Sequence, residues 1–168
     1  MTLVAIALGS NLGDRVANLR AAVRLLGEQG IRPLRTSSIW ETEPIPADQP
    51  AFLNAALTAE TEAEPLDVLR RLKGIEAAMG RRPERRWGPR PIDLDLLFYG
   101  DTTVDTPELT VPHPRIPERA FVLAPLAEAW PGELPVLARR AVDILHELPP
   151  GGVERMGYTL DPGVNLSR

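Results

Sequence analysis

Two aspartates separated by one residue, Asp93 and Asp95, are the side chains of this sequence best placed to do chemistry. They alternate with the apolar residues Ile92, Leu94 and Leu96, and such a period of two is typical of a β-strand. Residues two apart on a strand point to the same face, at a spacing of roughly 6–7 Å. Two carboxylates this close repel each other unless positive charge lies between them. A divalent cation such as Mg²⁺, which prefers carboxylate, water and phosphate oxygens, would supply that charge.

Arginines just upstream offer a second source of positive charge. Arg81, Arg82, Arg85, Arg86 and Arg90 fall in one short segment that prolines and a glycine interrupt. Because proline and glycine disfavour a regular helix, we expect an arginine-rich loop beside the acidic strand. An acidic pair, a metal and guanidinium groups are together typical of sites that handle polyphosphates. The alternative is a solvated run of charges in which the arginines neutralise the two aspartates.

The properties of the whole chain exclude several classes of protein. The 168 residues predict a single domain spanning 1–168, and the formal net charge of -4 argues against a protein that coats nucleic acid. The absence of cysteine excludes a disulfide framework and a thiolate metal site. The first eight residues lack the features of a signal peptide, and no stretch approaches the ~20 apolar residues of a membrane span. We therefore expect a cytoplasmic protein without membrane association.

Hydrophobic patterning predicts the elements that position the acidic pair. A buried strand is expected at 3–8, followed by a helix in which apolar residues recur every three or four positions. Further strands are expected at 31–42, 52–59 and 92–99, with a second helix beginning at Pro65. This strand-helix-strand-strand-helix-strand order is that of the α+β ferredoxin-like fold, an antiparallel sheet with helices on one face. Extra C-terminal helices are predicted at 118–129 and 142–147, and a loose tail from Pro149.

Several motifs agree in order and spacing with one enzyme family. The most specific is Arg86-Trp87-Gly88-Pro89-Arg90 followed by Asp93-Leu94-Asp95. The others are the segments 9–15, 42–44, 48–55, 111–114 and 119–121. With these motifs the chain resembles the 6-hydroxymethyl-7,8-dihydropterin pyrophosphokinases (HPPK) of folate biosynthesis. The resemblance covers roughly residues 3–127, and residues 130–168 match poorly, as a C-terminal extension.

The resemblance implies transfer of the terminal diphosphate of ATP to the hydroxymethyl oxygen of the pterin, with release of AMP. It implies two Mg²⁺ ions held by Asp93 and Asp95, with ATP as the co-substrate. Metals in that place would join the carboxylates to the phosphate oxygens, so that positioning and electrostatics carry the catalysis. The residues that it implies for catalysis are Arg81, Arg90 and Asp95.

The same resemblance implies two binding sites. Those for ATP are Arg81, Trp87, Arg90, Thr110, His113 and Arg119, and those for the pterin are Thr42, Pro44, Ile45, Phe52, Asn54 and Phe121. The two phenylalanines would stack on the flat heterocycle, and Asn54 would donate to and accept from its edge. Considered without the family, His113 is a turn residue held between two prolines, and both phenylalanines are core residues.

The sequence is also compatible with two other functions. An RNA-binding module on the same fold would use aromatic side chains and the arginine loop, although the aspartates would repel the RNA backbone. A nucleotidyltransferase also uses paired aspartates, but it would transfer AMP and release diphosphate. For partners we expect small-molecule substrates, with no nucleic acid and no membrane, and a monomer.

Overall fold

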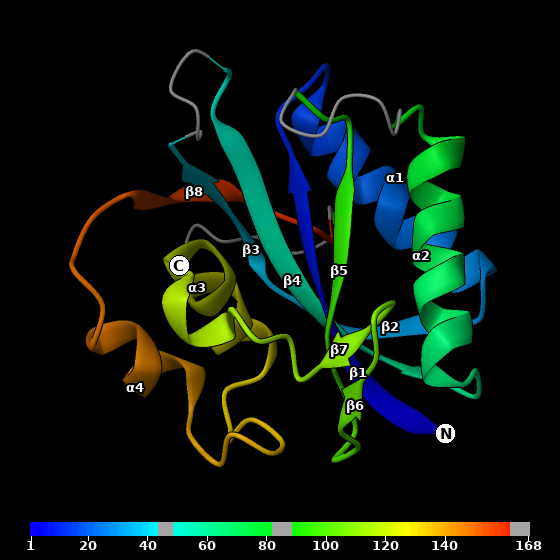
Figure 1. Cartoon of the computed structure of the whole chain (residues 1–168). Coiled ribbons are helices and arrows are strands. Elements are labelled where there is room, and N and C mark those ends of the chain that lie inside the picture. Colours follow the sequence, from blue (N-terminus) through cyan, green and yellow to red (C-terminus); the bar gives the residue numbers. More distant parts are fainter. Residues whose placement is uncertain (44–48, 82–88, 162–168) are drawn as a thin grey trace.

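A six-stranded antiparallel sheet forms the centre of the computed structural model, which describes residues 1–43, 49–81 and 89–161 (Figure 1). Its strands lie in the order β5-β1-β4-β3-β8, and β2 also pairs with β4. Their bounds are β1 Thr2–Ser10, β2 Ile31–Thr36, β3 Ser38–Thr42, β4 Phe52–Thr61, β5 Asp93–Tyr99 and β8 Val153–Thr159. A separate hairpin joins β6 (Val104–Asp105) to β7 (Thr110–Val111).

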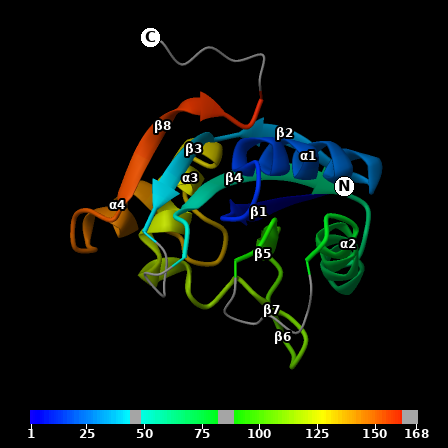
Figure 2. The same ribbon diagram turned by 90° about the horizontal axis from the view of Figure 1, so that it is seen from above.

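Helices cover both faces of this sheet (Figure 2). Helices α1 (Arg15–Glu28) and α2 (Pro65–Ala78) pack on one face, where they share a core with Val4 and Ile6 of β1. On the other face α3 (Ala120–Ala129) and α4 (Ala141–His146) pack with Ala5 of the same strand. Successive residues of a strand point to opposite faces, so β1 is apolar on both sides, as its continuous apolar run predicts. A 3₁₀ turn, η1 (Ile116–Glu118), precedes α3.

The strand expected at 31–42 is divided in two at Ser37. The N–H of Ser37 donates to the carbonyl of Ala56, and the Oγ of Ser37 accepts the N–H of Ala56. A serine side chain thus takes over one hydrogen bond of the ladder, which ends regular pairing at this residue. As a result β2 pairs with the C-terminal half of β4 and β3 with its N-terminal end.

The prediction of a loose tail from Pro149 is wrong. After a turn in which Gly151 and Gly152 have φ values of 98° and 81°, β8 pairs antiparallel with β3 at the edge of the sheet. Only glycine adopts such positive φ values without strain, and the turn returns the chain to the sheet. The other extensions are helical as predicted, with α4 at Ala141–His146. In the described part of the chain no helix is long and apolar enough to cross a membrane.

Candidate active site

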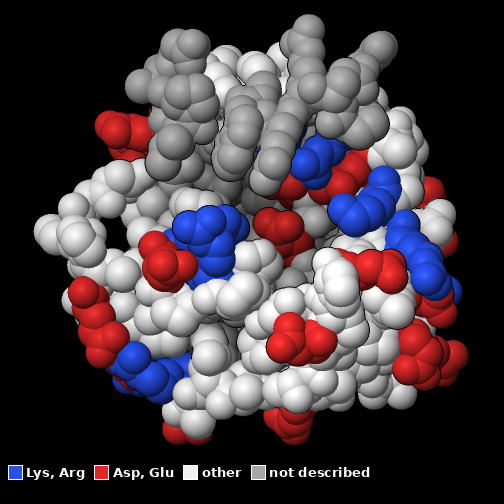
Figure 3. Space-filling model, in the orientation of Figure 1, with Lys and Arg blue, Asp and Glu red and all other residues white. Residues whose placement is uncertain are grey.

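A cavity of about 490 Å³ opens between the sheet and the start of α3. The cavity is lined by residues of β1, β4 and β5, by the end of β3, and by the segment that contains η1 and the start of α3. These residues are Ala7, Leu8, Gly9, Thr42, Glu43, Phe52, Asn54, Asp93, Asp95, Arg115, Glu118, Arg119, Phe121 and Val122. On the face of the molecule that carries β5 and α3, acidic and basic side chains gather around a hollow (Figure 3). A larger groove of about 740 Å³ between α1 and β2 contains none of the predicted site residues.

The register of the sheet explains why these residues converge. Gly9 of β1 pairs with Asp93 on one side and with Asn54 on the other, and Ala7 pairs with Asp95. Paired residues of antiparallel strands share a face, so Asp93, Gly9 and Asn54 form one row across the sheet. A Cβ atom on Gly9 would lie 3.2 Å from Oδ1 of Asn54. Small residues therefore form the cavity floor between the carboxylates and Asn54.

The two carboxylates of the acidic pair have different surroundings. Oδ1 of Asp93 lies 2.7 Å from Nη1 of Arg81, and Oδ2 lies 3.4 Å from Nη1 of Arg90. Asp95 has no hydrogen-bond or ion-pair partner among the residues that the structure describes. Burial, and then the charge of Asp93, raise the pKa of Asp95 to about 6, against the lowering effect of the nearby arginines. The acidic pair thus presents one carboxylate bound to arginine and one open to the cavity.

The donor set of the acidic pair fits a hard cation. Within residues 1–43, 49–81 and 89–161, no group of three or more His, Cys, Asp or Glu side chains could hold a metal. A magnesium ion needs no such group, because it is commonly bound by one or two carboxylates while water and substrate phosphates complete its octahedron. Asp95, raised in pKa by its own desolvation, would gain most from a cation. To bind a metal, Asp93 would have to give up its contacts with Arg81 and Arg90.

Glu76 of α2, which was not predicted from the sequence, also belongs to this charged network. It is only 6% exposed, and its Oε2 accepts from Nη1 of Arg81 at 2.6 Å and from the N–H of Leu94 at 2.8 Å. Burial raises the pKa of Glu76 against the opposing hydrogen bond from Leu94. The sequence signal was available, since Glu76 lies one helical turn after the buried Leu72, on the apolar face of α2.

The predicted pterin residues lie at the other end of the cavity. Phe52 is half-buried and Phe121 is 37% exposed, so neither is a core residue. The Arg119 guanidinium lies 5.5 Å from the ring centroid of Phe121. Nδ2 of Asn54 donates to Oγ1 of Thr42 at 2.7 Å, which fixes the orientation of this buried amide. Pro44 and Ile45 lie outside the described residues.

The predicted ATP residues are less closely grouped. Arg119 lines the cavity, whereas Thr110 and His113 do not, and Trp87 lies outside the described residues. The backbone N–H of His113 donates to Leu97 at 2.7 Å, which ties the segment after β7 to β5. Nδ1 of His113 accepts the N–H of Arg115 at 3.2 Å. Burial, and then the charge of Arg119, lower the pKa of His113, which favours the neutral ring. A neutral ring that accepts a hydrogen bond on Nδ1 carries its proton on Nε2. Arg115, which was not predicted, also lines the cavity.

Asn11, in the turn after β1, makes hydrogen bonds to two segments that are distant in the sequence, at residues 49–50 and at Arg90. Its fully buried side chain accepts the N–H of Arg90 at 2.7 Å and donates to Oε1 of Gln49 at 3.1 Å and to the carbonyl of Pro50 at 3.3 Å. Gln49, Pro50 and Arg90 are therefore held to the turn after β1.

Comparison with known proteins places the chain in a family. A model described as 7,8-dihydro-6-hydroxymethylpterin-pyrophosphokinase (HPPK) matches residues 5–131. The chain belongs to the HPPK family. This confirms the family expected from the motifs, and the match contains every predicted site residue while ending before α4 and β8.

The relatives differ in length. A mitochondrial folate synthesis bifunctional protein of Pisum sativum is 52% identical over 126 residues, which are 74% of this chain and 24% of that protein. The 2-amino-4-hydroxy-6-hydroxymethyldihydropteridine pyrophosphokinase of Methylorubrum extorquens is 44% identical over 158 residues, or 93% of this chain and 99% of that protein. The chain thus spans about a quarter of the plant relative and nearly all of the bacterial one.

A solved structure shares the fold. In the crystal structure of Plasmodium falciparum HPPK-DHPS with pteroate, the matching region has a TM-score of 0.71 at 14% identity, covering 87% of this chain and 44% of that one. The mixed α and β architecture with an antiparallel sheet is therefore similar to the fold of that solved structure.

Proposed function

We propose that this protein transfers the terminal diphosphate of ATP to the hydroxymethyl group of 6-hydroxymethyl-7,8-dihydropterin in folate biosynthesis, releasing AMP. Family membership supports the reaction class. The observation that carries the proposal is the row Asp93, Gly9 and Asn54, which sets carboxylates and a polar amide at opposite ends of one cavity floor. Such a floor suits a phosphate chain at one end and a flat heterocycle at the other.

At the acidic end, Asp93 and Asp95 are the residues that would hold two Mg²⁺ ions. Bound there, Mg²⁺ would neutralise phosphate charge and stabilise the attacking and leaving oxygens of an in-line displacement. Arg81 and Arg90, which contact Asp93, would bind phosphate oxygens if a metal replaced them at that carboxylate. Arg119, which directly precedes α3, would bind the phosphate chain of ATP. Neutral His113 would donate through its Nε2 proton.

At the other end, the pterin would lie between the rings of Phe52 and Phe121. Stacking suits a planar heterocycle, and both rings are exposed to the cavity rather than buried in the core. With its Nδ2 committed to Thr42, Asn54 retains its carbonyl oxygen and one N–H for the aminopyrimidinone edge. Thr42, with Pro44 and Ile45 in the same segment, would complete the site.

The architecture supports the finer fold assignment as well. If β2 and β3 are taken as one strand interrupted at Ser37, the strand order becomes that of a β-α-β-β-α-β ferredoxin-like sheet. The described residues pack around this one sheet, in keeping with one pyrophosphokinase domain over residues 1–168. A cytoplasmic location, a monomeric state and the lack of a nucleic-acid partner stay predictions.

The test is identification of the products. With ATP, the pterin and Mg²⁺, we expect AMP and pterin diphosphate in equal amounts, and no AMP when the pterin is omitted. Release of diphosphate with AMP bound to the acceptor would instead indicate a nucleotidyltransferase. Formation of ADP would contradict the proposal, and so would salt-sensitive RNA binding without turnover.

A further inference from the structure

Glu128, near the end of α3, connects three separate segments of the chain. Its Oε1 accepts from Nε1 of Trp40 at 2.7 Å and its Oε2 from Oγ of Ser38 at 2.6 Å. Nη2 of Arg155 in β8 lies 3.6 Å from the same Oε2, while Nε of Arg155 donates to Oγ of Ser38 at 3.0 Å. We call Ser38, Trp40, Glu128 and Arg155 the Glu128 clamp. The reaction described above makes no use of it.

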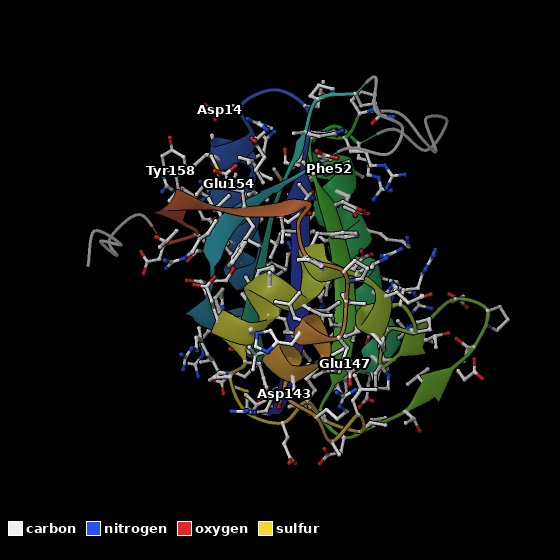
Figure 4. All side chains as sticks on the ribbon, turned by 90° about the vertical axis from the view of Figure 1, so that its left-hand side faces the viewer. Asp14, Phe52, Asp143, Glu147, Glu154 and Tyr158 are labelled. Carbon is white, nitrogen blue, oxygen red and sulfur yellow. The ribbon has the colours of Figure 1, made fainter. Side chains whose placement is uncertain are left out.

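The clamp lies beside the pterin end of the cavity. Ser38, Trp40 and Thr42 alternate along β3, so their side chains share one face. Trp40 pairs across the ladder with Asn54, and Thr42 pairs with Phe52. The indole that binds Glu128 is therefore the direct neighbour of the Asn54 and Thr42 pair. β8, which carries Glu154 and Tyr158, pairs with β3 at this edge of the sheet (Figure 4).

The opposite end of α3 forms the other wall of the cavity. Phe121 and Val122 line the cavity in the first turn, and Glu128 lies about 10 Å further along the helix axis, at 1.5 Å per residue. Pro125 lies inside α3 between these two turns, and the helix is only ten residues long. Holding its last turn against β3 therefore limits how far its first turn can move from β4. Bonds to an ionised carboxylate are stronger and shorter than neutral ones, which suits an anchor of this kind.

We propose that the Glu128 clamp sets the distance between the sheet and α3, and so the spacing of the two walls that would enclose the pterin. Arg155 and Glu128 are then positioning residues for that substrate. This inference rests on the proposed function. It gives β8, which lies beyond the residues matched by the family model, a part in the site.

Kinetics of three variants test the substrate side of the proposal. Arg155→Met keeps the aliphatic stem of the side chain and removes the ion pair. Glu128→Gln replaces the carboxylate by an amide, which keeps only one acceptor oxygen. We expect the KM for the pterin to rise about three- to tenfold in each variant, with kcat and the KM for ATP within about twofold of wild type. Arg70→Met, which removes an exposed ion pair with Asp67 on α2, is the matched control and should change none of them.

A distance measurement tests the clamp without turnover. Since the chain has no cysteine, spin labels can be placed at Arg24→Cys on α1 and Ala127→Cys on α3. The distance distribution should broaden in Arg155→Met and Glu128→Gln and not in Arg70→Met. An unchanged distribution, or a broadened one with an unchanged pterin KM, would overturn the inference. If the wild-type protein shows no turnover, the proposed function is wrong. In that case the distances between the spin labels still show whether the Glu128 clamp holds α3 in place.

Discussion

Nη1 of Arg81 lies 2.7 Å from Oδ1 of Asp93, so an arginine occupies one carboxylate of the acidic pair. The sequence offered two sources of charge for this pair, a metal and the arginine loop, and the structure has the arginine at Asp93 while Asp95 faces the cavity without a partner among the described residues. Asp95 would hold a cation directly, whereas Asp93 would have to give up its contact with Arg81 to do so. Arg81 would then stay beside the phosphate chain through its contact with Glu76.

Replacing Asp95 by asparagine should separate activity from stability. We expect turnover to fall at least about a hundredfold, since the carboxylate proposed to hold the metal is lost. The melting temperature should stay the same or rise, because the variant removes a desolvated charge that the described residues leave unpaired. AMP formation and thermal unfolding measure the two effects. Asp101→Asn, in the exposed turn after β5, is the control and should behave as wild type.

The protonation of Asp95 should be visible near neutral pH. Its pKa is raised to about 6 in the folded protein, against ~3.9 in an unfolded chain. Between these pH values the folded state holds the extra proton, so this group's stabilising contribution is complete below pH ~4 and is lost as the pH rises through about 6. Carbon-13 NMR of the labelled carboxyl group should give a midpoint near 6, and a lower one in Asp93→Asn. A midpoint near 4 in the wild type would contradict this assignment.

Glu76→Gln should weaken both the fold and the reaction. The amide oxygen can still accept from Leu94, but the charge that holds Arg81 is lost. We expect the free energy of unfolding in urea to fall by about 1–3 kcal/mol, and kcat to fall because Arg81 is less well placed. Glu147→Gln, directly after α4 and far from Phe52 in Figure 4, removes only an exposed pair with Arg139 and should unfold at the wild-type midpoint. Equal behaviour of the two variants would refute the role given to Glu76.

Phe121→Ala should impair binding of the pterin with little effect on stability. Stacking on an aromatic ring is worth roughly 1–3 kcal/mol per base, so we expect the pterin KM to rise about tenfold. The ring is 37% exposed, so its loss leaves no core cavity and the melting temperature should change little. Tyr158→Ala, which removes an exposed ring on β8, controls for loss of surface aromatic area. A large fall in melting temperature with an unchanged KM would mean that Phe121 has a packing role.

The elements that depend on neighbouring residues in the chain could be predicted from the sequence. The period of two around Asp93 and the apolar spacing in α1 and α2 depend on neighbours in the chain, and these elements lie where expected. Glu76 was missed because a helical carboxylate is usually solvated, and only the fold brings Leu94 and Arg81 to it. The strand β8 was missed for a similar reason: Glu154, Arg155 and Gly157 carry no strand pattern, and pairing with β3 and the bonds to Ser38 and Glu128 decide their conformation.

Binding without turnover tests the central claim most directly. Wild-type protein and Asp95→Asn would be titrated by calorimetry with a non-hydrolysable ATP analogue, with and without Mg²⁺, and then with 6-hydroxymethyl-7,8-dihydropterin. If the acidic pair holds Mg²⁺ with the nucleotide, the analogue should bind tightly to wild type only when Mg²⁺ is present, and the pterin should bind after it. The analogue should bind to the variant at least about a hundredfold more weakly. Equal affinity of both proteins for the analogue, or affinity in wild type that does not depend on Mg²⁺, would contradict it.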